Sequence, residues 1–348
     1  MHPIVIEAGS IERIRAHLPD AHAYVVVSDS NVAALHAQRV QRAIPSSHLL
    51  TFPAGEASKT RETWQALTDA MLDLHAGRDS CVIAVGGGVT CDLAGFVAAT
   101  YMRGVPVVQV PTSLLAMIDA AVGGKTGVDV PAGKNLVGAF HAPHAVVIDP
   151  AVLTTLPDAE LSNGLAEAVK HGAIADRAYL DWIAESAASI FDRRLHTLES
   201  LIRRSVEIKS AFVKDDVRET GARAALNFGH TVAHALEQLS HYEVTHGRAV
   251  GLGMMIEAEI GVALGVTHER VTADIANALA HVRLPDSIVV ENGMPLIEAT
   301  GHDKKGRSGE VRYVLLETVG KVARTEAGEW TWAVPDDVVR KALRQFSV

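Results

Sequence analysis

Short apolar runs rich in β-branched residues alternate with longer stretches of helical periodicity through the first half of the chain. In those longer stretches, apolar residues recur at a spacing that suits one face of a helix. Alternation of this kind is typical of a mostly parallel sheet with helices packed on it, so we predict an α/β, Rossmann-like nucleotide-binding domain over residues 1–150. The expected strands are Ile4 to Ile6, Tyr24 to Val27, Leu49 to Phe52, Cys81 to Val85, Val107 to Val110 and Ala145 to Ile148, and the expected helices are Ile11 to Leu18, Val32 to Ala43, Arg61 to His75 and Asp92 to Tyr101.

The pattern changes after Pro150, where strand-like runs nearly vanish and helical periodicity dominates from Asp158 to about Ala280. A chain of 348 residues also exceeds what one hydrophobic core usually organises. We therefore predict a second, mainly α-helical domain over residues 151–348. Near the end, residues 311–316 and 331–334 look extended with Gly320 between them, which favours a small hairpin.

Composition narrows the possible partners and the compartment. A formal net charge of -9 gives no overall basic field, which argues against nucleic acid as the main partner. The only cysteines, Cys81 and Cys91, are too few for a disulfide framework and favour a reducing cytoplasm. The most apolar long run, residues 251–266, is interrupted by Glu257 and Glu259. We expect a soluble cytoplasmic protein with no membrane segment.

Four polar, glycine-rich patches lie between Gly86 and Phe140 and indicate a site for phosphorylated molecules. The first, Gly86 to Gly88, follows an apolar strand and precedes the helix expected near Asp92. Its N–H groups and the helix dipole could face a pyrophosphate, while a plain strand-to-helix turn is an equal alternative. The spacing is not GxGxxG and Asp29 comes before the glycines, so any dinucleotide fold here differs from the common variant.

Two further patches place a lysine beside glycine in what we expect to be loops. Lys125 follows Gly124, but a P-loop requires a glycine where Asp119 stands, which argues against an NTPase of that class. Lys134 and Asn135 follow Gly133 and repeat the arrangement with a second cation and an amide. Two cationic loops raise the expectation of an oxyanion-rich substrate.

Histidines and a carboxylate in the helical half suggest a metal site. His230 and His234 lie four residues apart on one helical face, and His246 follows after a short polar segment. Glu167 and Lys170 lie three apart on an otherwise apolar helix. A carboxylate, two imidazoles and an open position commonly hold catalytic zinc, although structural or surface histidines are the alternative in a chain with 17 of them. The HExxH motif of zincin proteases is absent.

Several remaining charges are ambiguous from their residue types alone. Lys209, Glu219 and Arg223 precede Asn227 on the way into the histidine helix, and Asp303 to Lys305 come near the end. Charges on helices usually form a solvated face, and that interpretation is favoured locally for both groups.

Taken together and in this order, the patches resemble the 3-dehydroquinate synthase family of sugar phosphate cyclases, from Ser28 to about Leu316. Family members cyclise 3-deoxy-D-arabino-heptulosonate 7-phosphate to 3-dehydroquinate in the shikimate pathway, using NAD and a divalent metal, usually zinc, with cobalt as the other candidate. The stretches that carry the resemblance are Ser28 to Asn31, Gly55 to Lys59, Gly86 to Gly104, Pro111 to Ser113, Asp119 to Gly127, Gly133 to Asn135, the Glu167 helix, Asn227 to His234, His246-Gly247 and Asp303 to Lys305.

The resemblance also implies roles for individual residues. The metal ligands would be Glu167, His230 and His246, so His234 would act beside the substrate phosphate rather than as a ligand. Arg103 matches an arginine that the family supplies from a neighbouring subunit, which implies a homodimer. The implied NAD contacts are Asp29, Asn31, Gly55, Glu56, Lys59, Gly87, Gly88, Asp92, Thr112, Ser113, Lys125, Lys134, Thr154 and Thr155. The implied catalytic and substrate contacts are Asp119, Lys125, Asn135, Lys170, Lys209, Glu219, Arg223, Asn227, His234 and Lys305 or its neighbour Lys304.

Three positions depart from the family pattern: Cys91 and Ala233 replace glycines, and Arg248 stands where a glutamate is frequent. None of them removes an implied ligand. The alternatives are a cyclase acting on sedoheptulose 7-phosphate, a metal-dependent polyol dehydrogenase, or an inactive binding paralogue. Retention of Lys209, Arg223 and the Asp303 to Lys305 segment favours a substrate with a carboxylate. We expect the active site to lie in a cleft between the two domains.

Overall fold

The computed structural model describes residues 2–241, 243–284, 299–300, 310–344 and 346. The chain divides into two compact units. Unit 1 comprises Met1–Leu161 and Arg193–Val206, and unit 2 comprises Ser162–Asp192 and Glu207–Val348. Two of the three divisions fall within helices α5 (Asp158–Ala175) and α7 (Leu195–Val213), and the third, between Asp192 and Arg193, lies just before α7.

Unit 1 is built on a six-stranded sheet with the order β1-β8-β5-β4-β2-β3, in which every pairing is parallel. Strands β4 and β5 are buried along their whole length, as expected when helices cover both faces. The six predicted strands and the α/β fold class are confirmed. The strands are β1 (Ile4–Ile6), β2 (Ala23–Asp29), β3 (His48–Phe52), β4 (Ser80–Gly86), β5 (Val107–Pro111) and β8 (Ala145–Ile148).

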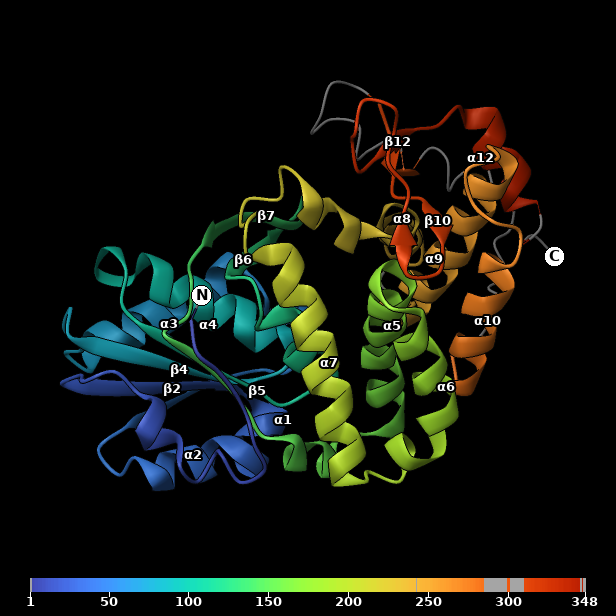
Figure 1. Cartoon of the computed structure of the whole chain (residues 1–348). Helices are drawn as coiled ribbons and strands as arrows, with labels where there is room; N and C mark the ends of the chain where they lie inside the picture. The colour runs from blue at the N-terminus through green and yellow to red at the C-terminus, as the bar shows by residue number, and fades with distance from the viewer. Residues whose placement is uncertain (1, 242, 285–298, 301–309, 345, 347–348) are drawn as a thin grey trace. The chain divides into compact units, whose positions relative to one another are not determined.

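Helices pack on both faces of this sheet (Figure 1). On one face, α3 (Arg61–Asp73) and α4 (Gly88–Thr100) bury Leu67 and Val97 against Val25 and Val82. The other face carries one continuous helical stretch made of three segments: α1 (Ser30–Val32), the π-helical η2 (Ala33–Ala37) and α2 (Gln38–Ala43). The apolar spacing therefore predicted this helical stretch, although not the π-helical turn inside it.

Two helix predictions in unit 1 were wrong in extent. Only a 3-10 turn, η1 (Ile14–His17), forms within the helix expected over Ile11 to Leu18. Helix α4 begins at Gly88 rather than near Asp92, with Gly87 as its N-cap. Glycine is a poor helix former, so propensity alone places the start too late.

The two lysine-glycine patches predicted as loops are strands instead. Residues Lys125–Val130 form β6 and Gly133–Phe140 form β7, paired antiparallel in a separate ribbon. Glycine is depleted in strands, but these strands approach closely. A Cβ atom on Gly127 would lie 2.8 Å from the Val137 carbonyl oxygen. The contact requires glycine, and this same glycine conceals the strand in the sequence.

Unit 2 is mainly helical, as predicted. Its extended segments form two short pairs rather than one hairpin: β10 pairs with β11 around Gly320, and β9 pairs with β12. Beyond α5 and α7, its described elements are α6 (Arg177–Phe191), η7 (Ala222–Asn227), α8 (His230–Leu239), α9 (His246–Ala263), α10 (Val271–His281), β9 (Arg312–Tyr313), β10 (Leu316–Thr318), β11 (Lys321–Val322), β12 (Trp332–Ala333) and α12 (Asp336–Leu343).

Helix α9 is the centre of unit 2. It contacts α8, α10 and α12, and most of its side chains are buried, including Glu257. A helix that is apolar nearly all round belongs in a core. None of the helices in the described part of the chain is long and apolar enough to cross a bilayer.

A buried histidine joins three segments of unit 1. His36 Nδ1 lies 3.1 Å from the Arg39 guanidinium, and its Nε2 lies 2.8 Å from the Thr155 hydroxyl. Arginine only donates, so Nδ1 accepts and Nε2 carries the hydrogen, which makes the ring neutral. The Thr155 hydroxyl then donates to the Val152 carbonyl at 2.9 Å. Burial, with the charge of Arg39, lowers the pKa of His36 below its usual 6.5.

This network predicts a pH-dependent stability. Below pH 6.5 the unfolded chain takes up a proton at His36 more readily than the folded one, so the network's contribution is lost as pH falls. We expect His36→Leu to lower the free energy of unfolding by about 1–3 kcal/mol at pH 7 and by clearly less at pH 5, measured by urea denaturation. The exposed His48, replaced by Gln, is the control. An equal loss from His36→Leu at both pH values would contradict the neutral-ring assignment.

Candidate active site

A buried carboxylate on α5 is the centre of the site in unit 2. Glu167 is fully buried, and its Oε2 forms an ion pair with Lys170, which lies one turn further along the same helix and is also buried. Burial alone would raise the pKa of Glu167. The charge of Lys170 and a hydrogen bond with His246 outweigh burial and hold this pKa well below its usual value. Glu167 is therefore an anion at neutral pH.

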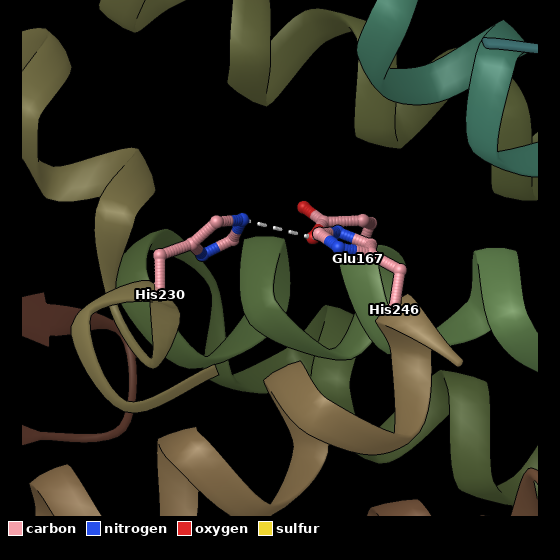
Figure 2. Close-up of side chains that lie close together, drawn as sticks. All are labelled: Glu167, His230 and His246. Carbon is pink, nitrogen blue, oxygen red and sulfur yellow. Dashed lines mark hydrogen bonds and ion pairs between the residues drawn. The ribbon is translucent and has the colours of Figure 1, made fainter. Parts of the chain in front are cut away.

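Two imidazoles meet the other oxygen of this carboxylate, as Figure 2 shows. The Nε2 atom of His246 lies 3.2 Å from Glu167 Oε1, and that of His230 lies 3.5 Å from the same oxygen. One ligand atom from each of the three residues falls within 4.8 Å of the others. His230 and His246 are the first residues of α8 and α9, so two helix N-termini position the rings.

The other nitrogen of each ring faces an acceptor. His230 Nδ1 lies 3.3 Å from the Phe228 carbonyl oxygen, and His246 Nδ1 lies 3.7 Å from Glu237 Oε1. Partners on Nδ1 orient the rings so that both Nε2 atoms point to Glu167. Burial, with Lys170, lowers the pKa of His230 well below its usual value. Hydrogen bonds with Glu167 and Glu237 outweigh burial at His246 and raise its pKa to about 9.

This donor set fits a divalent metal. One carboxylate oxygen and two Nε2 atoms converge, and each ring has an acceptor near its second nitrogen, the arrangement that supports metal-binding histidines. Three protein ligands would leave a coordination position for a substrate. The structure thus brings together the three residues that the sequence suggested as metal ligands.

A close backbone contact fixes the distance between α5 and the start of α9. The Gly247 N–H donates to Asn163 Oδ1 at 2.5 Å, and Asn163 precedes Glu167 by one turn. A Cβ atom on Gly247 would lie 2.8 Å from the Asn163 Cα atom, so only glycine permits this approach. The contact therefore sets His246 against Glu167.

His234 lies beside the cluster rather than in it. Its ring centroid is 5.5 Å from that of His230, the rings are edge-on, and His234 is exposed. Two departures from the family pattern lie in this region: Ala233 is buried in α8, and Arg248 is exposed.

A loop before α8 gathers several predicted substrate residues. The Asp216 carboxylate shapes the loop by accepting hydrogen bonds from the backbone N–H groups of Thr220, Gly221 and Arg223 at 2.7–2.9 Å. Glu219 then accepts a hydrogen bond from the Asn227 side chain. Arg223 and Lys209 are both buried. Lys304 and Lys305 lie outside the described residues.

Several of the predicted nucleotide residues of unit 1 lie at the carboxyl ends of the sheet strands. The strand order reverses between β2 and β4, which is where parallel α/β sheets bind ligands. Asp29 ends β2, accepts N–H bonds from Asn31 and Val32, and receives the Thr90 hydroxyl at 3.2 Å. Gly87, at the end of β4, caps α4 without a side chain, so the first N–H groups of that helix are available to an anion.

A buried lysine links residues expected at NAD with one expected at the substrate. The Lys59 ammonium donates to Asp92 Oδ2 at 2.6 Å and to Asn135 Oδ1 at 2.5 Å. Burial would lower the pKa of Lys59, but the charges of Asp92 and Glu56 outweigh it and raise this pKa. Lys134 pairs with Glu56 at 3.7 Å. One polar network thus contains five of the predicted residues.

The other predicted residues of unit 1 have simpler surroundings. Asp119 lies in η5 (Ala116–Ala120), and Lys125 is the first residue of β6. Thr154 and Thr155 end η6 (Pro150–Thr155). Arg103 is exposed, with a φ of 68° at the end of η4 (Tyr101–Arg103). Two predicted glycines are placed by the backbone: Gly55 has a φ of 105°, and Gly88 begins α4. Beside β5, the Thr112 N–H donates to the Gly86 carbonyl oxygen, and the Ser113 hydroxyl accepts the Ala116 N–H.

Sequence reasoning missed the residues that support the site. Asn163 and Glu237 contact Gly247 and His246 at the start of α9, Asp216 shapes the loop before α8, and Asp129 accepts the Asn135 N–H at 2.8 Å. Short Asp and Asn side chains often bind nearby backbone groups, so Asp216 in the polar stretch before Gly221 was a usable signal. Contacts between distant segments, such as Asn163 with Gly247, carried no such signal.

Known structures resemble this chain over nearly its whole length. A 2-deoxy-scyllo-inosose synthase complexed with carbaglucose-6-phosphate, NAD⁺ and Co²⁺ is 25% identical over 99% of this chain and 96% of its own, with a TM-score of 0.90. A 2-epi-5-epi-valiolone synthase from Streptomyces hygroscopicus, with NAD⁺ and Zn²⁺ bound, is 26% identical with the same coverage and a TM-score of 0.89. Maleylacetate reductase from Agrobacterium tumefaciens shares the fold alone, at 14% identity, 99% and 96% coverage and a TM-score of 0.71.

The fold and these likenesses define the class as the sugar phosphate cyclase superfamily. Residues 49–163 match the 3-dehydroquinate synthase N-terminal domain, and residues 164–306 match the 3-dehydroquinate synthase C-terminal domain. The chain therefore belongs to the 3-dehydroquinate synthase family, and the resemblance inferred from its motifs is confirmed.

The histidine geometry predicts different outcomes for two neighbouring alanine variants. His230→Ala removes one of the three converging ligand atoms. Losing a residue that only supports a metal ligand typically lowers metal affinity roughly 10–100-fold, so we expect His230→Ala to lower Zn²⁺ affinity by more than that. His234→Ala should keep the metal and turn over poorly. Competition with a chromophoric chelator measures both. Equal loss of metal from the two variants would show that His234 is a ligand.

Proposed function

We propose that this protein is a 3-dehydroquinate synthase, which converts 3-deoxy-D-arabino-heptulosonate 7-phosphate to 3-dehydroquinate and phosphate. The observation that carries the proposal is the convergence of Glu167, His230 and His246 beside Lys170, in a chain of this family. The overall reaction consists of transient oxidation, phosphate elimination, reduction and intramolecular aldol closure. It is the reaction of an NAD- and metal-dependent carbon–oxygen lyase of the shikimate pathway.

Two cofactors would serve this chemistry, and the residues fit both. Glu167, His230 and His246 would hold a divalent metal, with Zn²⁺ favoured and Co²⁺ as the alternative, and the carboxyl ends of β2 and β4 would hold NAD. When bound, the metal lowers the pKa of a substrate hydroxyl, and NAD takes up a hydride and later returns it. The similar cyclase structures, which contain NAD⁺ with Co²⁺ or Zn²⁺, support this assignment.

The chain's own charges would bind and orient the substrate. Lys170 offsets the charge of Glu167 and keeps that carboxylate ionised in the interior. Cations held in one site are suited to fixing a carboxylate and a phosphate at the two ends of one small molecule. Much of the rate acceleration would come from this positioning. We assign this binding to Lys125, Lys209, Arg223, His234 and one of Lys304 and Lys305, with Asp119, Asn135, Glu219 and Asn227 completing the site.

This proposal differs from its main alternative, a cyclase of sedoheptulose 7-phosphate, in whether the substrate carries a carboxylate. Lys209 and Arg223 are buried cations that suit the carboxylate of a heptulosonate. The likeness to 2-deoxy-scyllo-inosose and valiolone synthases favours instead a sugar phosphate without a carboxylate, such as sedoheptulose 7-phosphate. A polyol dehydrogenase and an inactive paralogue are more distant alternatives.

A homodimer is part of the proposal. Arg103 ends an exposed turn in which Met102, Arg103 and Gly104 all have positive φ angles, of 49°, 68° and 112°. Strained turns of this kind persist where a function requires them. Arg103 from one subunit would then complete the active site of the other.

A single assay separates the candidate activities. With NAD and Zn²⁺ present, 3-deoxy-D-arabino-heptulosonate 7-phosphate should give equal amounts of phosphate and 3-dehydroquinate without net formation of NADH. A phosphate assay measures the phosphate, and absorbance measures 3-dehydroquinate and NADH. His230→Ala is the inactive control. Turnover of sedoheptulose 7-phosphate alone would replace the proposal with the alternative cyclase, and steady accumulation of NADH would indicate a dehydrogenase.

A further inference from the structure

Helices α8 and α9, which begin with His230 and His246, are held together by a glycine contact of unusual closeness. Gly229 precedes His230 and has a φ of 82°. A Cβ atom on Gly229 would lie 2.8 Å from Met254 atoms and 2.9 Å from the Val250 carbonyl oxygen, and one on Gly253 would lie 2.9 Å from the Gly229 carbonyl carbon. The backbone that leads into His230 therefore lies directly on one face of α9.

The same face of α9 carries a carboxyl group that the proposed chemistry does not use. Glu257 follows Gly253 by one turn and is fully buried. Its Oε2 accepts the Gly229 N–H at 2.8 Å. Burial raises the pKa of Glu257 to about 8, partly opposed by the backbone N–H groups of Gly229, Val232, Thr231 and Val314. Burying a polar group this deeply costs folding free energy unless hydrogen bonds compensate for the lost hydration, so the bond to Gly229 needs a reason.

We propose that Glu257 is a positioning residue that fixes the first turn of α8, and thereby sets His230 at the correct distance from His246. The inference rests on the proposed metal site. The first N–H groups of a helix have no partner within it, and Glu257 supplies an acceptor for that end of α8 from the helix that carries His246. One side chain thus connects the two ligand helices at a point adjacent to a ligand.

The geometry gives this role an effect on metal binding beyond stability. Metal ligands must be held within about 0.5 Å of their productive positions. Gly229 has no side chain, so its peptide is held by packing on α9 and by the bond to Glu257. Without that bond, packing and the helical bond from the Ala233 N–H to the Gly229 carbonyl would hold this backbone less firmly, and we expect the His230 ring to shift with it.

The test compares two substitutions of Glu257 with a control on the same helix. Glu257→Met keeps the volume and removes the acceptor, whereas Glu257→Gln keeps an acceptor oxygen. Glu259→Met, two residues on and partly exposed, controls for loss of a glutamate from α9. Zn²⁺ affinity is measured by chelator competition on samples whose circular dichroism matches that of the unsubstituted protein.

We expect Glu257→Met to weaken Zn²⁺ binding about 10–100-fold, with Glu257→Gln restoring most of the affinity and Glu259→Met leaving it unchanged. A folded Glu257→Met protein with unchanged Zn²⁺ affinity, even if less stable to heat, would overturn the proposal. If the unsubstituted protein itself does not bind Zn²⁺ through His230, the proposed metal site fails instead, and the two failures are distinguishable.

Hydrogen exchange keeps the inference testable if Glu257→Met does not fold. In the unsubstituted protein without metal, the amides of residues 229–232 should already be protected from deuterium exchange, because Glu257 orders them before metal arrives. Protection that develops only after Zn²⁺ is added would mean that the metal, and not Glu257, orders this turn.

Discussion

Close backbone packing against α9 is the constraint on which the cluster of Glu167, His230 and His246, the proposed metal ligands, depends. Two glycines of this helix permit it: Gly247 lies against Asn163 on α5, and Gly253 lies against Gly229 at the start of α8. Each contact lies beside a ligand or one turn from it. Ridges and grooves of ordinary side chains leave helix axes 8–10 Å apart, so ligand atoms from three helices meet here because the backbones approach without intervening side chains.

The same packing buries a charged pair, which costs folding free energy because both charges lose their hydration. Glu167 and Lys170 form an ion pair away from water, where loss of one partner typically costs about 3–5 kcal/mol. A well-packed apolar pair would stabilise α5 at least as well. The charges are better explained by function, because an ionised carboxylate is what a divalent cation requires of its ligand.

Much of the fold could be predicted from the sequence, and the failures have identifiable causes. All six sheet strands follow apolar, β-branched runs whose burial on both faces gives a strong pattern. The β6–β7 ribbon was missed because Gly127 and Gly138 replace the residues that normally mark a strand. The cluster of Glu167, His230 and His246 required the family resemblance, since spacing alone favoured the adjacent pair His230 and His234. Glu257 appeared only as an interruption of an apolar run, because its partner Gly229 is 28 residues away.

The network around Lys59 has a consequence for how two ligands would influence each other. One ammonium is shared between Asp92, on the nucleotide side of the proposed site, and Asn135, on the substrate side. A substrate that binds the Asn135 amide would replace its hydrogen bond with the Lys59 ammonium. The ammonium would then interact with Asp92 alone, and that ion pair would become stronger. Thermodynamic linkage then requires the reverse effect to be of equal size, so the affinities for nucleotide and substrate would be coupled through a single proton-bearing nitrogen.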